Sequence, residues 1–544
     1  MIDVGRGSPD WGQFYEHSAF PEAYRDAFLV CDYQWKSATS GGYANPGRVV
    51  AFHLDRADAT WKAEMTVLAQ PTRESGLGFG VVDVDVAPDG SLMISDHNQG
   101  VWRLFYDPEL DGAPPALLAG IPAHTPSIEA LLTLPQPMAE WSRVAQEAML
   151  EEGGELLREA LNVWIKDPAK PFRQRLRALR LRTPEFRDLK SALIEGLTKD
   201  PKPEMRGQAA WLVGLRQRTE EIPWVIGLLE DPDPFVRRRA AECFTRFTDQ
   251  RAVPGLIARL SEPNRFVRYA AMTALSHRST DELVTLMQGS LEPAALLRLL
   301  VSTHLRRERP DPADACRVVV RLLSAEHGDD SASQLDFLRV LGLFEKEVST
   351  NDALALRVHA FLLEGYPEPD NDIRWEKGRL LGDYGVAKGF ALLLKELERE
   401  TEGVTQFHLA DCLSRIPSGW TTEESQRLAR WLVSTQTGWF AEFESNARQF
   451  PSSWGAVLTR LGSLHGEAFM AEANQFVSGS QLADVGFKVI QKTPGAGQIV
   501  LRALGKASGL AETQRLLGIL EEIPTPAVVE ALLGQLDATI DQAR

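Results

Sequence analysis

The 544-residue sequence has no run of 18 or more apolar residues, so it predicts no membrane-spanning helix. It has only four cysteines, and none of them lies in a C-x-x-C or C-x-x-C-H motif, which argues against a redox dithiol and covalently attached haem. The first twenty residues lack the apolar segment of a secretory signal peptide. The motifs G-x-S-x-G and H-E-x-x-H and a Gly-rich phosphate loop are also absent, so no catalytic residue is predicted.

The cysteines and histidines have no spacing typical of a metal site. The ten histidines are scattered, and the cysteines lie far apart in the chain. Single cysteines of this kind are most often small buried hydrophobic residues, and free thiols suit a reducing compartment. We therefore predict no metal, no cofactor and four buried thiols, at Cys31, Cys243, Cys316 and Cys412.

The net charge of −16 is unevenly distributed along the chain. Residues 1–169 contain 11 Lys and Arg against 25 Asp and Glu, whereas residues 170–270 contain 21 against 13 and residues 271–544 contain 27 against 37. Phosphate binding requires a concentrated cationic surface. An acidic chain with one moderately basic segment therefore argues against a general nucleic-acid binder.

The first hundred residues contain short runs typical of β-strands. In "VVDVDV", the alternation places Val82, Val84 and Val86 on one side of a strand. "APDGS" then predicts a hairpin, because Gly90 can adopt the positive φ that the turn requires. Groups of strands recur about 50 residues apart, as in β-propeller blades, and only about two blades fit before the helices begin. The other predicted strands are "FLVCDY" (28–33), "GRVVAFHL" (47–54), "WKAEMTVLA" (61–69), "SLMIS" and "GVWRLFY".

These motifs carry a resemblance to a known family. The ordered set "FPEAYRDAFLVCDY", "GRVVAFHLD", "VVDVDVAPDGSLMISD" and "GVWRLFYD" resembles the last two blades of a sugar-dehydrogenase-like propeller. It is particularly similar to bacterial membrane-bound dehydrogenase-like or haem-binding proteins, in which a propeller is followed by HEAT repeats and a cytochrome c domain. The resemblance implies a dehydrogenase-linked role.

The sequence departs from that family at both ends. The upstream blades and the terminal C-x-x-C-H are absent from it, so neither dehydrogenase activity nor haem can be transferred to this chain. The resemblance implies that another chain, or a segment lost by truncation, supplies the missing blades. An upstream exported segment would predict a periplasmic location, and its absence a cytoplasmic one.

Acidic residues of the β segment are weak candidates for a calcium site. Asp83 and Asp85 lie on a strand, Asp89 in a turn and Asp96 beside a loop, so solvated carboxylates are the favoured interpretation over oxygen ligands. His97 lacks a partner nucleophile in the sequence, which favours a surface residue over a general base. We therefore predict no site here.

From about residue 141 onward the sequence predicts helices that repeat. The segments "PEMRGQAAWLVGL" (203–215), "PFVRRRAAECFTR" (234–246) and "RFVRYAAMTALSH" (265–277) are each 31 residues apart. Each helix pair has an apolar stripe that it cannot bury alone, and such units stack into a solenoid. The period resembles short bacterial HEAT repeats.

The predicted fold is therefore mainly α, a HEAT-repeat α-solenoid preceded by a small β segment resembling the last two blades of a β-propeller. We expect a partial propeller at 1–110, a linker at 111–140 and HEAT-like repeats at 141–544, most regular at 170–290. Trp375 and Trp439 fit either a core or a recognition role.

Two sets of arginines are the candidate site residues. One set occupies the same position in successive repeats. HEAT families usually have an arginine there that bonds turn carboxylates, and we interpret the set as a structural ladder of Arg206, Arg237 and Arg268. The second set lies on one helix face at i, i+4 and i+7: Arg173, Arg177 and Arg180. It could bind an acidic partner, remain solvated, or dock the acidic N-terminal segment. Interleaved aromatics for base stacking are missing.

Three functions remain open from the sequence. The favoured one is a non-catalytic scaffold that binds a protein partner, because the repeat is clear and no catalytic set is found. The alternative is a subunit of a sugar-dehydrogenase-like, haem-linked oxidoreductase whose catalytic blades and haem lie outside this chain. An enzyme built on the solenoid itself is the third and the least supported.

Overall fold

The computed structural model divides the chain into two compact units, unit 1 (Met1–Ser279) and unit 2 (Thr280–Arg544). The predicted calcium candidate Asp89 and the predicted recognition residue Trp439 lie outside the described residues, as does most of the predicted linker. The predicted domain boundaries stay predictions. The residues described are 8–17, 19–33, 47–72, 79–87, 90–97, 99–107, 128, 132, 139–306, 310–325, 331–434, 450–473, 497, 500–501, 504–505, 510–521, 523, 529 and 533.

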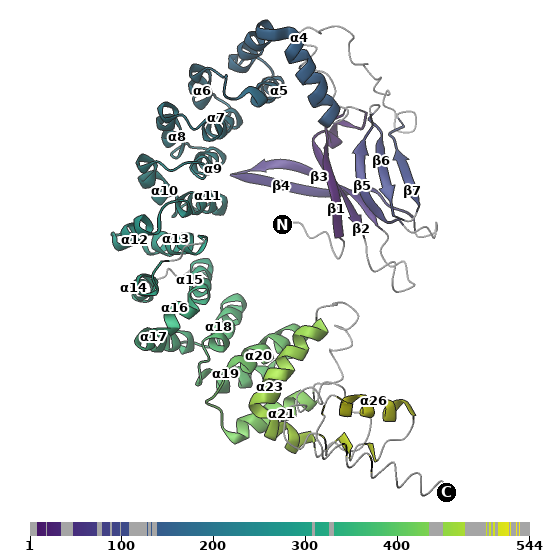
Figure 1. The fold of residues 1–544 in the computed structure, drawn as a ribbon, viewed down its shortest axis with the longest axis vertical. Coiled ribbons are helices and arrows are strands. Elements are labelled where there is room, and N and C mark those ends of the chain that lie inside the picture. Colours follow the sequence, from purple (N-terminus) through teal and green to yellow (C-terminus); the bar gives the residue numbers. More distant parts are fainter. Residues whose placement is uncertain are drawn as a thin grey trace. The chain divides into compact units, whose positions relative to one another are not determined.

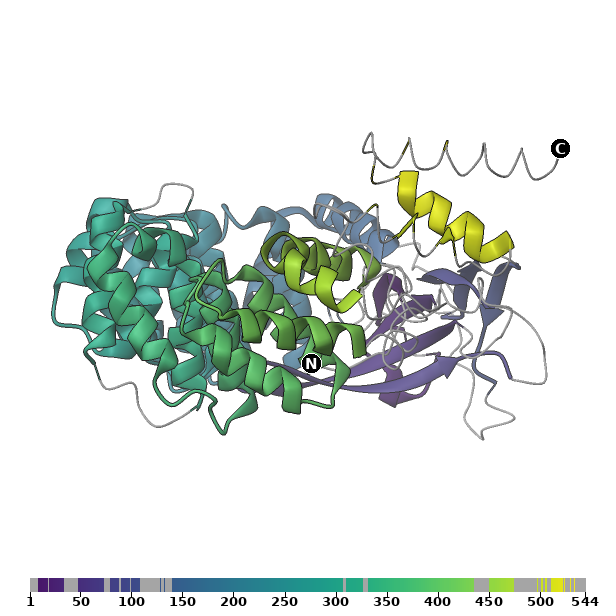
Figure 2. The same ribbon diagram turned by 90° about the horizontal axis from the view of Figure 1, so that it is seen from below.

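Unit 1 begins with two antiparallel sheets, which we name sheet A and sheet B (Figure 1). Sheet A has the strand order β1-β2-β3-β4 and sheet B the order β5-β6-β7, so each is a simple meander. The long hairpin of β3 and β4 is visible in both ribbon views (Figures 1 and 2). The strands are β1 (Ser8–Tyr15), β2 (Ala27–Tyr33), β3 (Arg48–Ala57), β4 (Thr60–Ala69), β5 (Val81–Val86), β6 (Leu92–Asp96) and β7 (Gly100–Leu104).

The two sheets share one apolar core. Leu29 and Ala51 of sheet A pack in the same cluster as Val84 and Ile94 of sheet B, and all four are buried. Tyr15 joins the sheets further, because its hydroxyl donates to the carbonyl of Gly90 at 2.8 Å. This arrangement fits β-branched and aliphatic side chains that alternate along each strand.

The strand predictions were correct with one omission and one local difference. Strand β1 was not predicted, because "SPDWGQFY" contains Pro, Asp and Gly, which are uncommon in strands. Gly90 has a φ of 82°, which confirms the predicted turn conformation. A register shift between Val81 and Asp83 interrupts the alternation, so Val81 is buried while Val82 is only partly buried.

The rest of unit 1 consists of helices that pair and stack. The first helices of successive pairs, α7 and α9, begin with Pro203 and Pro234, which suits a helical first turn because proline needs no N–H partner there. The predicted apolar stripe is buried, with Val236, Ala240 and Phe244 each at most 1% exposed. The helices are α4 (Ala139–Lys166), α5 (Phe172–Arg182), α6 (Ser191–Thr198), α7 (Pro203–Arg216), α8 (Ile222–Leu228), α9 (Pro234–Cys243), α10 (Val253–Arg259) and α11 (Arg265–Ser276).

Unit 2 continues with helices throughout its described part. The first helices of its pairs contact one another in the order α13, α15, α18, α20 and α23, and we name this the first-helix row of unit 2. No helix among the described residues is long and apolar enough to cross a membrane. The helices are α12 (Thr280–Gln288), α13 (Pro293–His304), α14 (Pro312–Leu323), α15 (Ser331–Leu343), α16 (Glu345–Ser349), α17 (Asp352–Leu363), α18 (Asn371–Asp383), α19 (Gly389–Arg399), α20 (Gly403–Arg415), α21 (Thr422–Ser434), α23 (Phe450–Ala473) and α26 (Leu510–Glu521).

The four cysteines are free and buried, as predicted. Burial raises the pKa of the Cys243 thiol to about 12, and it raises the pKa of Cys31 to the same value, with help from the negative charge of Asp83. Both thiols are therefore protonated at neutral pH and act as small core side chains.

Candidate functional site

The arginines at the repeat position bond from one repeat to the next. Arg206 donates to both carboxylate oxygens of Asp231, at 2.7 and 2.8 Å, and to the carbonyl of Asp200 at 2.8 Å. Arg237 makes the equivalent bonds, to Glu262 at 2.5 Å and to the carbonyl of Asp231 at 2.7 Å. Each guanidinium thus connects the turn before its own helix to the acidic residue that follows its own helix pair.

Arg268, the third predicted residue of the ladder, makes the contacts with the preceding turn. Arg268 donates to the carbonyl of Glu262 at 2.8 Å and to that of Pro263 at 2.7 Å. These bonds repeat the turn contacts of Arg206 and Arg237. The three residues therefore occupy equivalent places in the helical array.

A fourth arginine holds the same place and was missed. Arg175 lies 31 residues before Arg206, forms an ion pair with Asp200 and donates to the carbonyl of Ile165 at 2.8 Å. It is only 1% exposed. A step of one period back from Arg206 leads to Arg175, but "PFRQRLRALRLR" contains five arginines, and the i, i+4, i+7 spacing favours those on another face of the helix.

The three predicted partner-binding arginines of that helix contact the β region or the segment that follows it. Arg173 forms an ion pair with Asp26 at 2.9 Å, and Arg180 forms one with Glu16 at 3.5 Å. Arg177 donates to the carbonyl of Leu132 at 3.5 Å, and burial lowers the pKa of its guanidinium to about 10. Arg173 and Arg180 are more than 60% exposed, so these ion pairs contribute little free energy.

One arginine of the β3–β4 hairpin contacts two successive repeats. Arg56 donates to Glu204 of α7 at 2.5 Å, pairs with Asp233 before α9, and lies over the ring of Phe235 at 4.9 Å. The buried hairpin residue Ala59 accepts a hydrogen bond from Arg238 at 2.7 Å. Sequence reasoning missed this contact because its partners lie well over a hundred residues apart.

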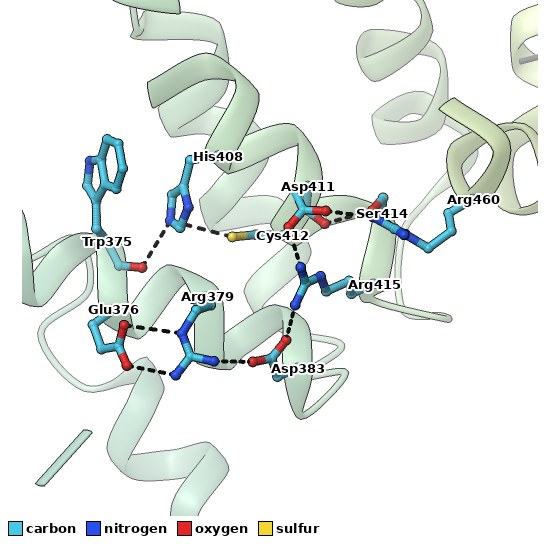
Figure 3. A network of polar contacts seen from close by, with 10 residues as sticks. All are labelled: Trp375, Glu376, Arg379, Asp383, His408, Asp411, Cys412, Ser414, Arg415 and Arg460. Carbon is cyan, nitrogen blue, oxygen red and sulfur yellow. Dashed lines mark hydrogen bonds and ion pairs between the residues drawn. The ribbon is translucent and has the colours of Figure 1, made fainter. Parts of the chain in front are cut away.

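A chain of alternating acidic and basic side chains follows the first-helix row of unit 2 (Figure 3). On α18, Arg379 bonds Glu376 at 2.7 Å and Asp383 at 2.5 Å. The hydrogen bonds that Arg379 donates to Glu376 raise the pKa of Arg379 above its ordinary value. Asp383 also pairs with Arg415 of α20, so the chain crosses from one helix pair to the next.

The chain continues from α20 to α23. Arg415 bonds Asp411 at 2.5 Å, and Asp411 accepts a second bond from Arg460 of α23 at 2.6 Å. Arg460 also donates to the hydroxyl of Ser414 at 2.9 Å. Arg415 and Arg460 remain about 40% exposed. We name the side chains of Glu376, Arg379, Asp383, Asp411, Arg415 and Arg460 the charged network of unit 2.

A pocket opens beside the charged network. Its volume is about 510 Å³, and both basic and acidic groups line it together with two glycines. Gly382 allows close packing, because a Cβ there would lie 2.7 Å from the carbonyl oxygen of Cys412. The lining residues are Gly342, Glu345, Gly382, Asp383, Ser414, Arg415, Pro417, Arg460, Ser463 and Leu464.

A cysteine and a histidine lie next to the network but are not arranged for nucleophilic catalysis. His408 Nε2 lies 3.0 Å from the carbonyl of Trp375, to which it donates, and 3.6 Å from Cys412 Sγ (Figure 3). A nitrogen that donates to a carbonyl cannot accept the thiol proton. Burial raises the pKa of Cys412 and lowers that of His408, so both groups are neutral. Trp375 stacks on His408 with a centroid distance of 4.6 Å.

A buried serine–histidine pair also lies in unit 2. Ser425 Oγ is 2.9 Å from His465 Nδ1, and His465 Nε2 has no hydrogen-bond partner among the described residues. The rings of Trp420 and Phe390 pack on His465, and burial lowers its pKa to about 4. His465 is 2% exposed, so a substrate has no access to this pair.

Two acidic candidates of the β region are engaged in local bonds. Asp96 accepts from the indole of Trp102 at 3.1 Å and from the backbone of Gly80 at 3.2 Å. Asp85 accepts from Gln13 at 3.2 Å. His97 packs edge-on against Tyr33. Within the described residues, no group of three or more His, Cys, Asp or Glu side chains is suited to hold a metal ion.

Comparison with known proteins matches the helical part of the chain. Residues 191–276 match a family model described as HEAT repeats. No curated protein matches the sequence. The predicted mainly helical fold of HEAT-like repeats, preceded by a small antiparallel β region, is confirmed.

Solved structures are similar at low identity. Human deoxyhypusine hydroxylase, in complex with glycerol, is 18% identical over 48% of this chain and 96% of its own, with a TM-score of 0.20. The CpcE and CpcF complex of phycocyanin lyase from Nostoc sp. PCC7120 is 16% identical over 62% and 96%, with a TM-score of 0.17. Kap121p is 11% identical over 74% and 55%, with a TM-score of 0.28.

Proposed function

We propose that this chain is a non-catalytic scaffold that binds a protein partner through the charged network of unit 2. The observation that carries the proposal is that the ion pairs of the network are solvent-accessible and border a pocket of about 510 Å³. Accessible ion pairs contribute about 0–1 kcal/mol each. A charged side chain of a partner can therefore replace one of them at little cost and gain the bidentate geometry of an arginine.

The alternating signs favour a protein over a nucleic acid. Asp383 and Asp411 lie between the arginines, so a polyphosphate would meet carboxylates along the same row. A folded protein surface carries charges of both signs and can match the alternation. The neutral, buried state of Cys412 and His465 supports binding rather than catalysis.

The test compares two arginines that differ in their place on the helices. Arg415 joins α20 to Asp383 of α18, whereas Arg427 of α21 joins Glu398 of α19, so both tie successive helix pairs together. They are 40% and 34% exposed. Arg427→Ala is therefore a matched control for Arg415→Ala.

We expect Arg415→Ala to reduce partner capture at least about tenfold, because loss of one charge-assisted contact costs about 1.5–3 kcal/mol. Arg427→Ala should leave capture unchanged. The measurement is quantitative mass spectrometry of proteins cross-linked to the purified variants in native lysate, with thermal unfolding recorded in parallel. Equal capture by both variants would refute the proposed surface.

A second candidate function rests on the two sheets. Sheets A and B are successive meanders that pack with β1 and β2 next to β5, an arrangement similar to two neighbouring propeller blades. This supports a role as a component or fragment of a propeller–HEAT dehydrogenase-like protein, with the catalytic blades and haem outside this chain. Coding sequence upstream that is unrelated to propeller blades would remove this candidate.

A further inference from the structure

The tip of the β3–β4 hairpin lies outside the apolar core that sheets A and B share. None of residues 54–63 belongs to that core, and Ala59 is the only one of them that is buried. Trp61, the largest apolar side chain of the tip, remains 53% exposed. The tip therefore depends on polar contacts with the helices more than on apolar burial.

Arg56 fills a site that two carboxylates and an aromatic ring form on the helices. Its guanidinium donates to Glu204 in the first turn of α7 at 2.5 Å and pairs with Asp233, the N-cap of α9. It also lies over the ring of Phe235, 4.9 Å from the ring centroid. The carboxylate of Asp233 is held in position, because it accepts a hydrogen bond from the backbone N–H of Phe235 at 2.9 Å. We name Glu204, Asp233 and Phe235 the arginine socket of unit 1.

The arginine socket occurs once in the regular repeats of unit 1. One repeat earlier, the positions of its two carboxylates carry Arg173 and Lys202, and one repeat later they carry Phe235 and Asn264. Residues 170–270 as a whole contain 21 Lys and Arg against 13 Asp and Glu. The socket is therefore an isolated acidic site in a basic region. A segment that binds there has to combine a cation with negative charge on either side of it.

The hairpin tip has this composition. Arg56 lies between Asp55 and Asp58, and both aspartates are exposed. Arg238 of α9 donates to the carbonyl of Ala59 at 2.7 Å. Two carboxylates and a ring face match a planar guanidinium better than the ammonium of lysine. The ligand that suits the site is therefore a turn that carries an arginine between two carboxylates and offers a backbone carbonyl to α9.

The contact of the tip with the socket is suited to exchange. The side chains of Arg56, Glu204 and Asp233 are 21%, 27% and 21% exposed, so water reaches both ion pairs. Ion pairs that water reaches contribute little free energy. An arginine of another protein can therefore replace Arg56 without leaving a buried charge unpaired.

We propose that the arginine socket of unit 1 binds an arginine-bearing turn of a partner protein, and that the hairpin tip fills the socket until the partner does. The tip is tethered to sheet A, so it competes at an effective concentration on the order of 1 mM. Only a segment that matches the socket closely displaces it, so the tip excludes weaker partners. This site is separate from the charged network of unit 2.

The experiment measures how a labelled cyclic peptide with the sequence of residues 53–64 binds the purified full chain, by fluorescence anisotropy. In Arg56→Glu, the carboxylates of the socket repel the tip, so the socket is open to the peptide. Arg56→Lys keeps the positive charge and is the conservative variant. Arg173→Glu is the matched control, because it reverses the charge of another arginine of unit 1 that pairs with an acidic residue, Asp26. Hydrogen exchange of α7 and α9 checks that the variants keep the fold.

We expect the peptide to bind Arg56→Glu at least about tenfold more tightly than the wild type, in which the tip competes. Binding to Arg173→Glu should equal binding to the wild type, and binding to Arg56→Lys should lie between the two Arg56 extremes. A peptide with alanine in place of its arginine should not bind. Addition of Glu204→Gln to Arg56→Glu should weaken binding again.

Equal binding of the peptide to Arg56→Glu and to the wild type would overturn the proposal, as would binding that does not need the arginine of the peptide. Absence of binding to an Arg56→Glu chain that keeps α7 and α9 protected would overturn it too. Loss of that protection in both Arg56 variants would mean that the hairpin tip is a permanent part of the helical array, which also contradicts the proposal. The test involves unit 1 alone, so its result is independent of the capture experiment for unit 2.

Discussion

The helical repeats of the two units use arginine in different ways. In unit 1, Arg175, Arg206 and Arg237 stand 31 residues apart and are mostly buried, and each bonds a backbone carbonyl that precedes its own helix and the acidic residue that follows its own helix pair. In unit 2, Arg379, Arg415 and Arg460 are 35–41% exposed, and they stand 36 and 45 residues apart. The 31-residue period therefore coincides with a buried hydrogen bond between arginine and an acidic residue. Where this buried bond is missing, the spacing between successive arginines varies.

The largest effect is expected from a substitution that breaks a buried ion pair of unit 1. Arg216 and Glu221 form an ion pair at 2.8 Å, and the side chains of both are fully buried. Arg216→Ala leaves an uncompensated buried carboxylate, which costs about 3–5 kcal/mol. Hydrogen exchange of the α6 to α8 segment, read by mass spectrometry, should show this loss in local unfolding free energy.

Arg218→Ala is the control for that prediction. Arg218 is less buried and donates to the backbone of Arg187 at 2.8 Å, so its loss should cost less than about 1 kcal/mol. Equal effects of the two substitutions would contradict the assignment of the stability to the Arg216–Glu221 pair.

The buried histidine of unit 2 should make the stability of its helices depend on pH. The pKa of His465 is lowered by burial to about 4 from an ordinary value of 6.5, so the unfolded chain binds a proton that the folded chain excludes. Stability from this residue is therefore complete above pH 6.5 and is lost as the pH falls toward 4, by up to about 3 kcal/mol. Hydrogen exchange of α21 and α23, corrected for the intrinsic pH dependence of amide exchange, should show lower protection as the pH falls over this range.

His465→Gln should flatten the pH dependence of α21 and α23. The helices α7 and α9 contain no histidine and provide the internal reference at each pH. If the two regions lose protection in parallel between pH 6.5 and 5, the histidine is not the cause.

The smallest effect is expected in the charged network of unit 2. Arg379 is 35% exposed and pairs with Glu376 and Asp383. Arg379→Ala should lower the local unfolding free energy of α18 by less than about 1 kcal/mol, and moderate salt should reduce the difference. A loss above about 2 kcal/mol would mean that the network is structural, like the arginines of unit 1, and would weaken the proposed exchange with a partner.

Sequence reasoning was strongest where local pattern and burial coincide. The 31-residue step found Arg206 and Arg237 because each helix begins with Pro and has a buried apolar residue directly before the arginine. It missed β1, whose strand conformation depends on pairing with β2 rather than on its own residues. Contacts such as that of Arg56 with Glu204 join distant segments, and no spacing along the chain encodes them.

The ion pairs of Arg56 with Glu204 and Asp233 bear on how far the helical array can bend. One guanidinium near the end of the β3–β4 hairpin pairs with acidic residues at the starts of two consecutive helix pairs. Bending or twisting of the array between α7 and α9 would have to stretch or release these bonds. We therefore expect the array to bend less between α7 and α9 than between repeats that lack such a contact.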